Sequence, residues 1–576
     1  MKNNFTYSEL KKLAKLSCYD YPSYKLGIIG DCATQSLAVA LRGMAQASNI
    51  TLDVLDCDYN QIYIQLMDTN SELYQFKPQS ILIVMSSEKL YEKYLSLETE
   101  KRDSFAQDML EQIKLYHSLA NTNSKANILQ TNFVEIDDKV FGNFSNKVSS
   151  SFLFQLRKLN YLLDEYALNQ KSVYIVDLLS IQNKMGRDTF HDDKIFMIAK
   201  MPFSNTALPQ IAYQITSIIN VIMGRIVKCV VVDLDNTLWG GVIGDDGLEG
   251  IQVGELGDGK AFTTLQSYLK ELKNRGIILC VCSKNNEDTA KEPFEKHPDM
   301  ILKLDDFAVF KANWDDKASN IRQIQQILNI GMDCMVFIDD NPFERNVVSS
   351  LIPEIIVADI PQDPALYTSY LRCQNYFETT SYSQEDKDRT SQYQAESSRV
   401  QLQSNFGNYE EYLQSLDMIA EVSPFDEFNI PRISQLTQRS NQFNLRTIRY
   451  TQSEIENISK DENYLTLYFK LKDQFGDHGL ISVVILKKQD AHTLFIDTWL
   501  MSCRVLKRTV EEFIINTIIN TAKENGFTQV IGEYIKTPKN SMVEHIYETM
   551  GFTKNDNKFD ADVLNFNFNT TYIKEN

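Results

Sequence analysis

The sequence lacks any uninterrupted hydrophobic run long enough to cross a bilayer as a helix, so no membrane segment is expected. It also lacks net positive charge: its 576 residues carry a formal net charge of −19, which disfavours nucleic acid and anionic lipid as partners. The first residues are charged and mixed rather than signal-like, and the nine cysteines are scattered without metal-binding spacing. These absences favour a cytoplasmic protein with reduced cysteines and with no nucleic acid or membrane partner.

Short apolar runs alternate with amphipathic stretches up to about residue 340. Such alternation predicts parallel strands covered by helices, and the length of the chain predicts about three domains. The polar residues 379–400 indicate a connecting helix or linker, and longer alternating strands after them indicate an α+β domain. The strands expected in the α/β part are residues 25–30, 50–56, 80–85, 126–134, 172–179, 227–235, 276–283, 300–304 and 333–340.

The most informative run is VVVDLDNTLWGG at residues 230–241, in which an apolar strand ends in Asp233 and Asp235. Residues two apart on a strand point to the same side. Both carboxylates are therefore expected at the carboxyl end of the strand, where open α/β sheets hold their ligands. Two adjacent carboxylates repel each other unless a cation lies close to them. The run thus predicts a reaction site rather than a buried strand that happens to end in a turn.

Three further elements accompany this run. One expected strand ends at Ser283, Lys317 lies in NWDDKASNI, and another strand ends at Asp339 and Asp340. In this order the four elements resemble the sequence motifs of the haloacid dehalogenase superfamily, over about residues 225–375. The resemblance implies a Rossmannoid phosphatase domain that uses Mg²⁺ as its cofactor.

The resemblance also implies a role for each residue. Asp233 is expected to attack phosphorus and form an aspartyl phosphate, while Asp235 protonates the leaving oxygen and then deprotonates water. Ser283 and Lys317 are expected to hold the oxygens of the transferring phosphoryl group. The metal ligands that it implies are Asp233, the backbone carbonyl of Asp235, Asp340 and, through water, Asp339.

The spacing of these motifs leaves no room for a full cap domain, because the intervals are only residues 236–282 and 284–316. The stretch WGGVIGDDGLEGIQVGE predicts a flap beside the site and nothing larger. An open site of this kind suits a phosphate that is tethered to a large partner.

A second set of reactive side chains lies nearer the N-terminus. GDCATQS follows the first expected strand, and GRDTFH follows the last strand of the same domain. Gly-Asp before a nucleophile, with a later Asp-x-x-His block, resembles the SGNH hydrolase fold, and Cys32 stands where that family usually has serine. The resemblance implies Cys32 as the nucleophile, His191 as the base and Asp188 as the orienting acid.

The Gly-x-Asn-Asp block of the same family is missing, because the third strand ends in MSSE at residues 85–88. The usual side-chain donor of the oxyanion hole is therefore absent, which disfavours simple ester hydrolysis. Acyl transfer stays open, because backbone donors can serve instead. The alternative is a buried structural cysteine in a degenerate scaffold.

The SGNH-like domain is followed by VVVDLDNTLWGGVIGDDG, VCSKNNEDTA, NWDDKASNI, LNIGMD and FIDDNPFER, and this succession resembles the FkbH-like glyceryltransferase/phosphatase family over most of the chain. The resemblance implies that Cys32 captures the glyceryl unit of 1,3-bisphosphoglycerate as a thioester. The phosphatase domain then removes the 3-phosphate. The glyceryl group passes last to the phosphopantetheine thiol of an acyl carrier protein, for polyketide-type biosynthesis.

The C-terminal part resembles acyltransferases of the GNAT fold through DTWLMSCRVLKRTVEEFIINTII and IYETMGF. The resemblance implies a pyrophosphate-binding loop at residues 504–509 with two glycines, but both glycine positions carry side chains here, which disfavours coenzyme A. The alternative is a structural or carrier-docking domain whose basic cluster attracts an acidic carrier protein. That cluster is Arg504, Lys507 and Arg508.

The expected domains are therefore an SGNH-like acyltransferase domain at residues 1–222, a phosphatase domain at 223–378, a linker at 379–400 and a GNAT-like domain at 401–576. Two alternatives are open. A stand-alone magnesium-dependent phosphatase of a small metabolite would leave the N-terminal domain inert, and Cys32 with its expected partners counts against it. The complete set of phosphatase residues counts against the other alternative, a non-catalytic scaffold.

Overall fold

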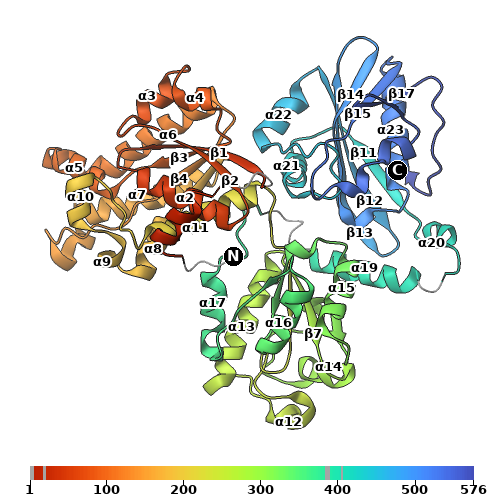
Figure 1. The fold of residues 1–576 in the computed structure, drawn as a ribbon, viewed down its shortest axis with the longest axis horizontal. Helices are drawn as coiled ribbons and strands as arrows, with labels where there is room; N and C mark the ends of the chain where they lie inside the picture. The colour runs from red at the N-terminus through yellow and green to blue at the C-terminus, as the bar shows by residue number, and fades with distance from the viewer. Residues whose placement is uncertain (1–4, 17–20, 383–388, 404–405) are drawn as a thin grey trace. The chain divides into compact units, whose positions relative to one another are not determined.

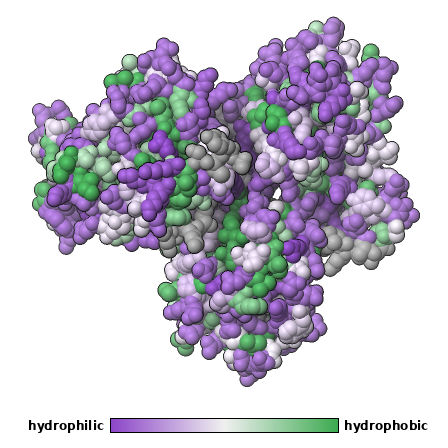
Figure 2. Space-filling view, viewed as in Figure 1, coloured by the Kyte–Doolittle hydropathy of each residue, from purple (hydrophilic) through white to green (hydrophobic). Residues whose placement is uncertain are grey.

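The computed structural model of the chain describes residues 5–16, 21–382, 389–403 and 406–576. The chain divides into two compact units, Met1–Ile219 and Asn220–Asn576 (Figure 1). Hydrophilic side chains dominate the face shown in Figure 2, and hydrophobic ones form small separate areas on it. Within the described ranges, no helix is both long enough and apolar enough to cross a membrane.

A five-stranded parallel sheet in the order β2-β1-β3-β4-β5 forms the centre of the first unit. Each strand overlaps one of the apolar runs expected there, because such runs are typical of parallel strands covered by helices. The parallel direction brings the carboxyl ends of all these strands to one edge of the sheet. The strands are β1 (Ser23–Gly30), β2 (Thr51–Asp56), β3 (Ser80–Val84), β4 (Asn127–Thr131) and β5 (Val173–Val176).

One helix precedes the first strand of this unit, and one or more helices follow each strand. The last of them, α11, ends at Ile222, so the boundary between the two units at Ile219 falls within this helix. The helices are α1 (Tyr7–Leu13), α2 (Gln35–Ala47), α3 (Ile62–Met67), α4 (Glu72–Phe76), α5 (Ser87–Leu95), α6 (Phe105–Asn123), α7 (Phe152–Ala167), α8 (Leu178–Met185), α9 (Arg187–Phe190), α10 (Asp193–Ala199) and α11 (Leu208–Ile222).

The first sheet of the second unit is also parallel, in the order β10-β9-β6-β7-β8. Its strands are β6 (Cys229–Val232), β7 (Ile278–Ser283), β8 (Phe307–Ala312), β9 (Met335–Ile338) and β10 (Ile356–Val357). Its helices are α12 (Ile243–Gly250), α13 (Gly257–Asn274), α14 (Glu287–Lys296), α15 (Lys317–Leu328), α16 (Pro342–Leu351) and α17 (Tyr367–Cys373). The α/β prediction is confirmed for this part of the chain.

One expected strand of this sheet is wrong. Residues 300–304 form no strand, and β8 begins after them at Phe307. The backbone amides of Ile301 and Leu302 donate hydrogen bonds to the side chain of Gln266 on α13, at 3.0 and 3.1 Å, instead of to a neighbouring strand. The apolar run at residues 300–304 is therefore not a strand, because burial alone does not specify strand pairing.

The second sheet of this unit is mixed, in the order β16-β17-β15-β14-β13-β12-β11-β18. Its long antiparallel strands agree with the expected α+β pattern. The strands are β11 (Ile419–Ser423), β12 (Tyr464–Asp473), β13 (Gly476–Lys488), β14 (Thr493–Met501), β15 (Gln529–Glu533), β16 (Thr553–Asn555), β17 (Lys558–Asp562) and β18 (Lys574–Glu575). The helices are α20 (Tyr409–Ser415), α21 (Ile430–Arg439), α22 (Gln452–Lys460), α23 (Val510–Glu524) and α24 (Ile546–Thr549).

Helix α19 (Arg389–Gln403) overlaps the expected connecting segment, of which residues 383–388 lie outside the described residues. Tyr393 on α19 is buried in the apolar cluster beneath the parallel sheet. Arg399, later in the same helix, donates to both carboxylate oxygens of Asp473, at 2.7 Å each. His478 lies 3.0 Å from the same carboxylate. The segment is therefore a structured element that joins the two sheets of the second unit.

Removal of the Asp473 charge tests this buried pair. Asp473→Asn would remove the carboxylate that accepts two hydrogen bonds from the buried Arg399 and leave it the longer contact with Glu396, at 3.3 Å. Breaking a buried ion pair in this way typically costs about 3–5 kcal/mol. We expect the free energy of unfolding of the second unit, followed by tryptophan fluorescence in urea, to fall by about that amount. Glu462→Gln removes an exposed carboxylate and should change it by less than about 0.5 kcal/mol. Equal effects of the two substitutions would contradict a stabilising role for the pair.

Candidate functional site

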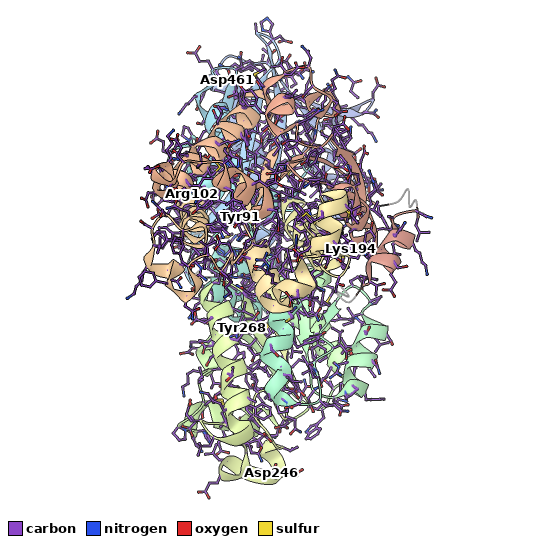
Figure 3. All side chains as sticks on the ribbon, turned by 90° about the vertical axis from the view of Figure 1, so that its left-hand side faces the viewer. Tyr91, Arg102, Lys194, Asp246, Tyr268 and Asp461 are labelled. Carbon is purple, nitrogen blue, oxygen red and sulfur yellow. The ribbon has the colours of Figure 1, made fainter. Side chains whose placement is uncertain are left out.

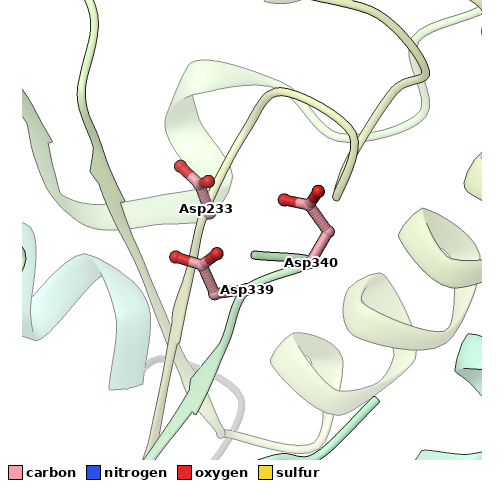
Figure 4. A group of neighbouring side chains, drawn as sticks. All are labelled: Asp233, Asp339 and Asp340. Atoms are coloured by element: carbon pink, nitrogen blue, oxygen red, sulfur yellow. The ribbon is translucent and has the colours of Figure 1, made fainter. Parts of the chain in front are cut away.

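Acidic and basic side chains gather at the carboxyl edge of the parallel sheet in the second unit. Asp233 directly follows β6, while Asp339 and Asp340 directly follow the neighbouring strand β9. Ser283 ends β7, on the other side of β6, and is buried. Lys317 is the first residue of α15, after β8. Figure 4 shows the three carboxylates side by side at the ends of the two strands.

The ammonium group of Lys317 holds two of these carboxylates. Its Nζ lies 2.7 Å from Asp233 Oδ2 and 2.5 Å from Asp339 Oδ2, and all three side chains are buried. Burial opposes the charge on Lys317, but the carboxylates of Asp233 and Asp339 outweigh it and raise the pKa of the lysine. Lys317 is therefore charged, and it offsets the repulsion between the two acids.

Asp339 and Asp340 are held in different ways. Asp339 is fully buried, and its Oδ1 accepts a hydrogen bond from the backbone N–H of Asn341 at 2.9 Å while its Oδ2 contacts Lys317. Asp340 is only partly buried, and the hydroxyl of Thr237 lies 3.4 Å from its Oδ1. Asp340 is thus better placed than Asp339 to offer an oxygen atom to a bound group.

The acidic cluster has the composition of a metal site. Asp233, Asp339 and Asp340 each offer an oxygen atom, and these atoms lie within 4.8 Å of one another. The Oδ1 atom of Asp233 is buried and has no hydrogen-bond partner. A buried carboxylate oxygen without a partner is costly, and hard divalent cations prefer oxygen ligands. The donor set therefore fits such a cation.

Asp235 lies two residues beyond the strand end and is fixed by three donors. The indole N–H of Trp239 and the backbone N–H of Ile243 donate to its Oδ1, at 2.9 and 3.0 Å. The side-chain amide of Asn285 donates to its Oδ2 at 3.0 Å. Burial raises the pKa of Asp235, and the hydrogen bonds from Ile243 and Trp239 offset part of that rise. A carboxyl group with these properties can hold a proton and return it.

Several of these supporting residues were not identified from the sequence. Trp239 and Thr237 lie inside the run that marked the site, and Asn285 follows Ser283 by two residues. Arg345 donates to the backbone carbonyls of Asp339 and Asp340, at 2.8 Å each, and so fixes the end of β9. Trp239, Thr237 and Asn285 could have been suspected because they lie in or beside the motifs. Which atoms they contact is shown only by the fold.

The flap expected beside the site is a short strap. Gly240 and Gln252 form two backbone hydrogen bonds with each other, at 2.9 and 2.8 Å, and α12 lies between them. Gly241 adopts a φ of 90°, which permits the tight turn into the strap. The side chain of Asp246, labelled in Figure 3, accepts a hydrogen bond from the backbone N–H of Val242 at 2.8 Å. The strap closes on itself and forms no cap domain.

In the first unit, Cys32 lies in the loop after β1. The loop is fixed on two sides: Ala33 N–H donates to the carbonyl of Lys200 at 2.9 Å, and Asp31 Oδ1 accepts from Ser86 N–H at 2.8 Å. The thiol of Cys32 is buried, with 2% of the residue exposed. Burial, and then the neighbouring carboxylates led by Asp31, raise the pKa of the thiol well above its usual range. These surroundings therefore favour the thiol over the thiolate.

His191 is buried at the end of the short helix α9. Its Nδ1 lies 2.8 Å from the carbonyl oxygen of Pro202 and 3.3 Å from Glu88 Oε1, and its Nε2 lies 3.3 Å from Asp193 Oδ1. Among the described contacts there is no hydrogen bond between Cys32 and His191. The structure therefore places both residues in one unit without joining them in a dyad.

Asp188 does not contact His191 in the structure, and its side chain is exposed to solvent. Two residues three apart share a face only while the helix continues, but α9 ends at Phe190. His191 has an extended backbone, with φ −115°, so its ring turns inward while Asp188 stays on the outer face. The Asp-x-x-His spacing therefore did not bring the two side chains together.

The loop at residues 504–509 keeps an unusual backbone. Lys507 and Thr509 have φ values of 62° and 58°, in the left-handed region that favours glycine. The backbone N–H of Lys507 donates to the side chain of Glu511 at 3.0 Å. Arg504 and Arg508 are buried and bonded within the protein, so they form no exposed docking cluster. Of the three basic residues expected to form the cluster, Lys507 is the one exposed to solvent.

The segment Phe443–Leu445 occupies the space between β14 and β15. These strands pair in parallel only over Thr493–Phe495 and Gln529–Ile531. Beyond that point Leu445 N–H donates to Trp499 O at 3.3 Å, and Ile535 N–H donates to Leu445 O at 2.9 Å. The segment Phe443–Leu445 is buried and satisfies the backbone of both sides.

Comparison with known proteins places these observations in context. The family model "FkbH, N-terminal domain" matches residues 25–220. A crystal structure of the N-terminal part of the protein BF1531 from Bacteroides fragilis, containing a phosphatase domain complexed with Mg, is 45% identical in sequence. It aligns with a TM-score of 0.63 over 66% of this chain and 100% of that chain.

Other solved structures are far less similar. The ribosomal-protein-S18-alanine N-acetyltransferase from Escherichia coli is 13% identical, and it aligns over 25% of this chain and 89% of its own with a TM-score of 0.19. A similarity of this size supports no argument about function. No curated protein matches the chain.

We expect acetyl-coenzyme A to bind the chain weakly or not at all, because Glu511 takes the Lys507 amide and the segment Phe443–Leu445 fills the space beside β14. Isothermal titration of the full chain measures this directly. Glu511→Ala frees the amide and should bind at least as well as the wild type, whereas Glu524→Ala, which removes an exposed carboxylate of the same helix, should change nothing. A dissociation constant in the micromolar range for the wild type would contradict the expectation.

Proposed function

This chain belongs to the FkbH family, and from that premise we propose that it is a magnesium-dependent phosphatase that also transfers a glyceryl unit to an acyl carrier protein. The observation that carries the phosphatase part is the buried cluster of Asp233, Asp339 and Lys317, with Asp340 beside it. Four charged groups gathered at the carboxyl edge of a parallel sheet are costly for stability alone, which favours a catalytic role.

Mg²⁺ suits the donor set, because Asp233 Oδ1 is buried without a partner and all the offered atoms are oxygens. We propose that Asp233, Asp340 and the backbone carbonyl of Asp235 hold the ion, and that Asp339 acts on it through water while it fixes Lys317. When bound, Mg²⁺ supplies positive charge that offsets the negative charge of the phosphoryl group.

The phosphatase steps then follow from the chain's own residues. A carboxylate oxygen of Asp233 attacks phosphorus, the bond from phosphorus to the substrate oxygen breaks, and an aspartyl phosphate forms. Asp235 gives its proton to the leaving oxygen and later takes one from the attacking water, which releases phosphate and restores Asp233. Lys317 and Ser283 stabilise the phosphoryl oxygens throughout.

The glyceryl part of the proposal rests on Cys32. Its sulfur attacks the acyl carbon of 1,3-bisphosphoglycerate, the bond from that carbon to the phosphate oxygen breaks, and phosphate leaves as the thioester forms. Because the resting group is a thiol, its proton must leave during attack, and His191 is the proposed acceptor. The phosphatase site then removes the 3-phosphate. The thiol of the carrier's phosphopantetheine then attacks the thioester carbonyl, the bond from that carbon to the Cys32 sulfur breaks, and the proton of the carrier thiol passes to the Cys32 sulfur.

Two features of the phosphatase site support a protein-bound phosphate as its substrate. The strap at Gly240–Gln252 is short, and no described residue between β6 and α15 forms a cap domain over the site. An uncapped site admits a phosphate that is still attached to a large molecule. The alternative is a phosphatase of a small free metabolite with an inert first unit. It is favoured by the burial and raised pKa of the Cys32 thiol, by the exposure of Asp188 and by the lack of a described hydrogen bond between Cys32 and His191.

Asp233→Asn should reduce phosphate release by on the order of 10³-fold or more, because it removes the nucleophile and one carboxylate of the metal site. Phosphate release from a phosphomonoester such as p-nitrophenyl phosphate measures the effect, and excess chelator should abolish the wild-type activity. Asp305→Asn, which changes an exposed aspartate of the same domain, should leave the rate unchanged. Release at the wild-type rate by Asp233→Asn, or in chelator, would exclude the aspartyl-phosphate mechanism.

Incubation with 1,3-bisphosphoglycerate should place a covalent adduct on Cys32. In the Asp233→Asn background the adduct should retain the phosphoglyceryl mass, because the second step is blocked. A phosphopantetheinylated carrier protein should then remove it, and intact-mass measurement follows both changes. His191→Ala should slow adduct formation by roughly 10² to 10⁴, the usual contribution of a general base.

Cys32→Ala is the matched control for this experiment. It should form no adduct, yet should still dephosphorylate a phosphoglyceryl-carrier substrate made by other means, because the two sites are chemically independent. An adduct that persists in Cys32→Ala, or no adduct on the wild type, would make Cys32 structural and favour the plain phosphatase.

A further inference from the structure

The loop after β3 places a buried carboxylate against His191. Glu88 lies in the first turn of α5, with 9% of the residue exposed, and its Oε1 is 3.3 Å from His191 Nδ1. Its other oxygen, Oε2, is buried without a hydrogen-bond partner. A buried carboxylate that is only half satisfied costs stability, so its place beside the imidazole calls for a functional reason.

The other acids near this histidine are differently placed. Asp193 lies 3.3 Å from His191 Nε2, but its side chain is 93% exposed, so water screens its charge. Asp188 is exposed as well and makes no described contact with the ring. Lys194, labelled in Figure 3, follows Asp193 on α10 and is also exposed. Glu88 is therefore the buried carboxylate of the described residues that faces the imidazole.

The same loop also reaches the cysteine. Ser86, two residues before Glu88, donates its backbone N–H to Asp31, and Asp31 directly precedes Cys32. Burial, Asp31 and then Glu88 raise the pKa of the Cys32 thiol. A carboxylate near a thiol opposes the thiolate unless a positive charge forms beside it. An imidazolium at His191 would be such a charge, and Glu88 is placed to stabilise it.

We propose that Glu88, and not Asp188, is the positioning residue that holds His191 and stabilises its protonated form while Cys32 is acylated. The proposal rests on the function proposed above for Cys32. The carbonyl of Pro202 accepts the Nδ1 proton at 2.8 Å, so Nε2 is the nitrogen that takes the thiol proton as sulfur bonds to the acyl carbon. The contact between sulfur and Nε2 forms with bound substrate, since catalytic hydrogen bonds often tighten only then.

The charged groups around this pair set the sign of the expected change. Glu88 and Asp193 face the ring, and Arg187 acts on Glu88 from α9. Asp31 and Asp56 act on Cys32 from the two neighbouring strand ends. Glu88 is the buried carboxylate that favours a protonated His191 ring. Because Glu88→Gln removes its charge, the ring should protonate at lower pH in this variant than in the wild type.

Two measurements on the full chain test the proposal. An NMR titration of ¹³C-labelled histidine, with the His191 signal identified through His191→Gln, should move toward lower pH in Glu88→Gln. The acid limb of the rate of adduct formation on Cys32 should move in the same direction, and the rate at pH 7 should fall by about tenfold or more. Glu88→Asp retains the charge and should restore the titration.

Asp188→Asn is the matched control and should leave both measurements unchanged. If Glu88→Gln does not fold, Glu88→Met removes the same charge with a flexible apolar side chain of similar length. An unmoved His191 titration in the neutral variants, or an equal shift in Asp188→Asn, would overturn the assignment of Glu88. Absence of any wild-type adduct would instead overturn the proposed function, because the titration needs no substrate and reads Glu88 independently.

Discussion

Repulsion among carboxylates at the end of a parallel sheet is the constraint on which the phosphatase site depends. Asp233 and Asp339 are both buried beside Asp340, and such a group would not stay ionised without a cation in contact with it. Lys317 supplies that charge from the first residue of α15, at 2.7 and 2.5 Å from two of the acids. Lys317 therefore offsets part of the negative charge of this site from within the chain.

The same principle governs the second half of this unit. Arg399 and Asp473 form a buried pair with two short hydrogen bonds, joined by His478, whose pKa burial lowers to about 4. This network joins helix α19 to the mixed sheet, and Tyr393 on the same helix packs beneath the parallel sheet. The polar segment α19 is thus fixed between the two sheets, because Arg399 is paired with Asp473 and its one aromatic ring, Tyr393, is buried. In the same domain, the segment Phe443–Leu445 fills the space between β14 and β15, and Glu511 accepts the backbone N–H of Lys507.

Charge balance also matters in the first unit, where Cys32 and His191 lie among carboxylates without a described hydrogen bond between them. Cys32 is buried among carboxylates that oppose the thiolate, so the proposed attack requires its proton to leave as the new bond forms. His191 is held by a backbone carbonyl and faces a buried glutamate. In the proposed function, Glu88 would balance the charge on His191 in this unit, as Lys317 balances its acids in the second unit.

The sequence by itself determined the α/β class and most strands. It also predicted the residues that gather at the carboxyl edge of the parallel sheet, because an apolar run that ends in a polar or charged side chain indicates both a buried strand and the end of that strand. It identified Asp233, Ser283, Lys317 and Asp339 with Asp340 as one set, since parallel strands bring their ends together. Only the tertiary structure decided the supporting contacts of Asp235, the exposure of Asp188 and the approach of Glu88 to His191. Those depend on where a helix ends and on which distant loops meet, and neither is encoded in the spacing of residues along the chain.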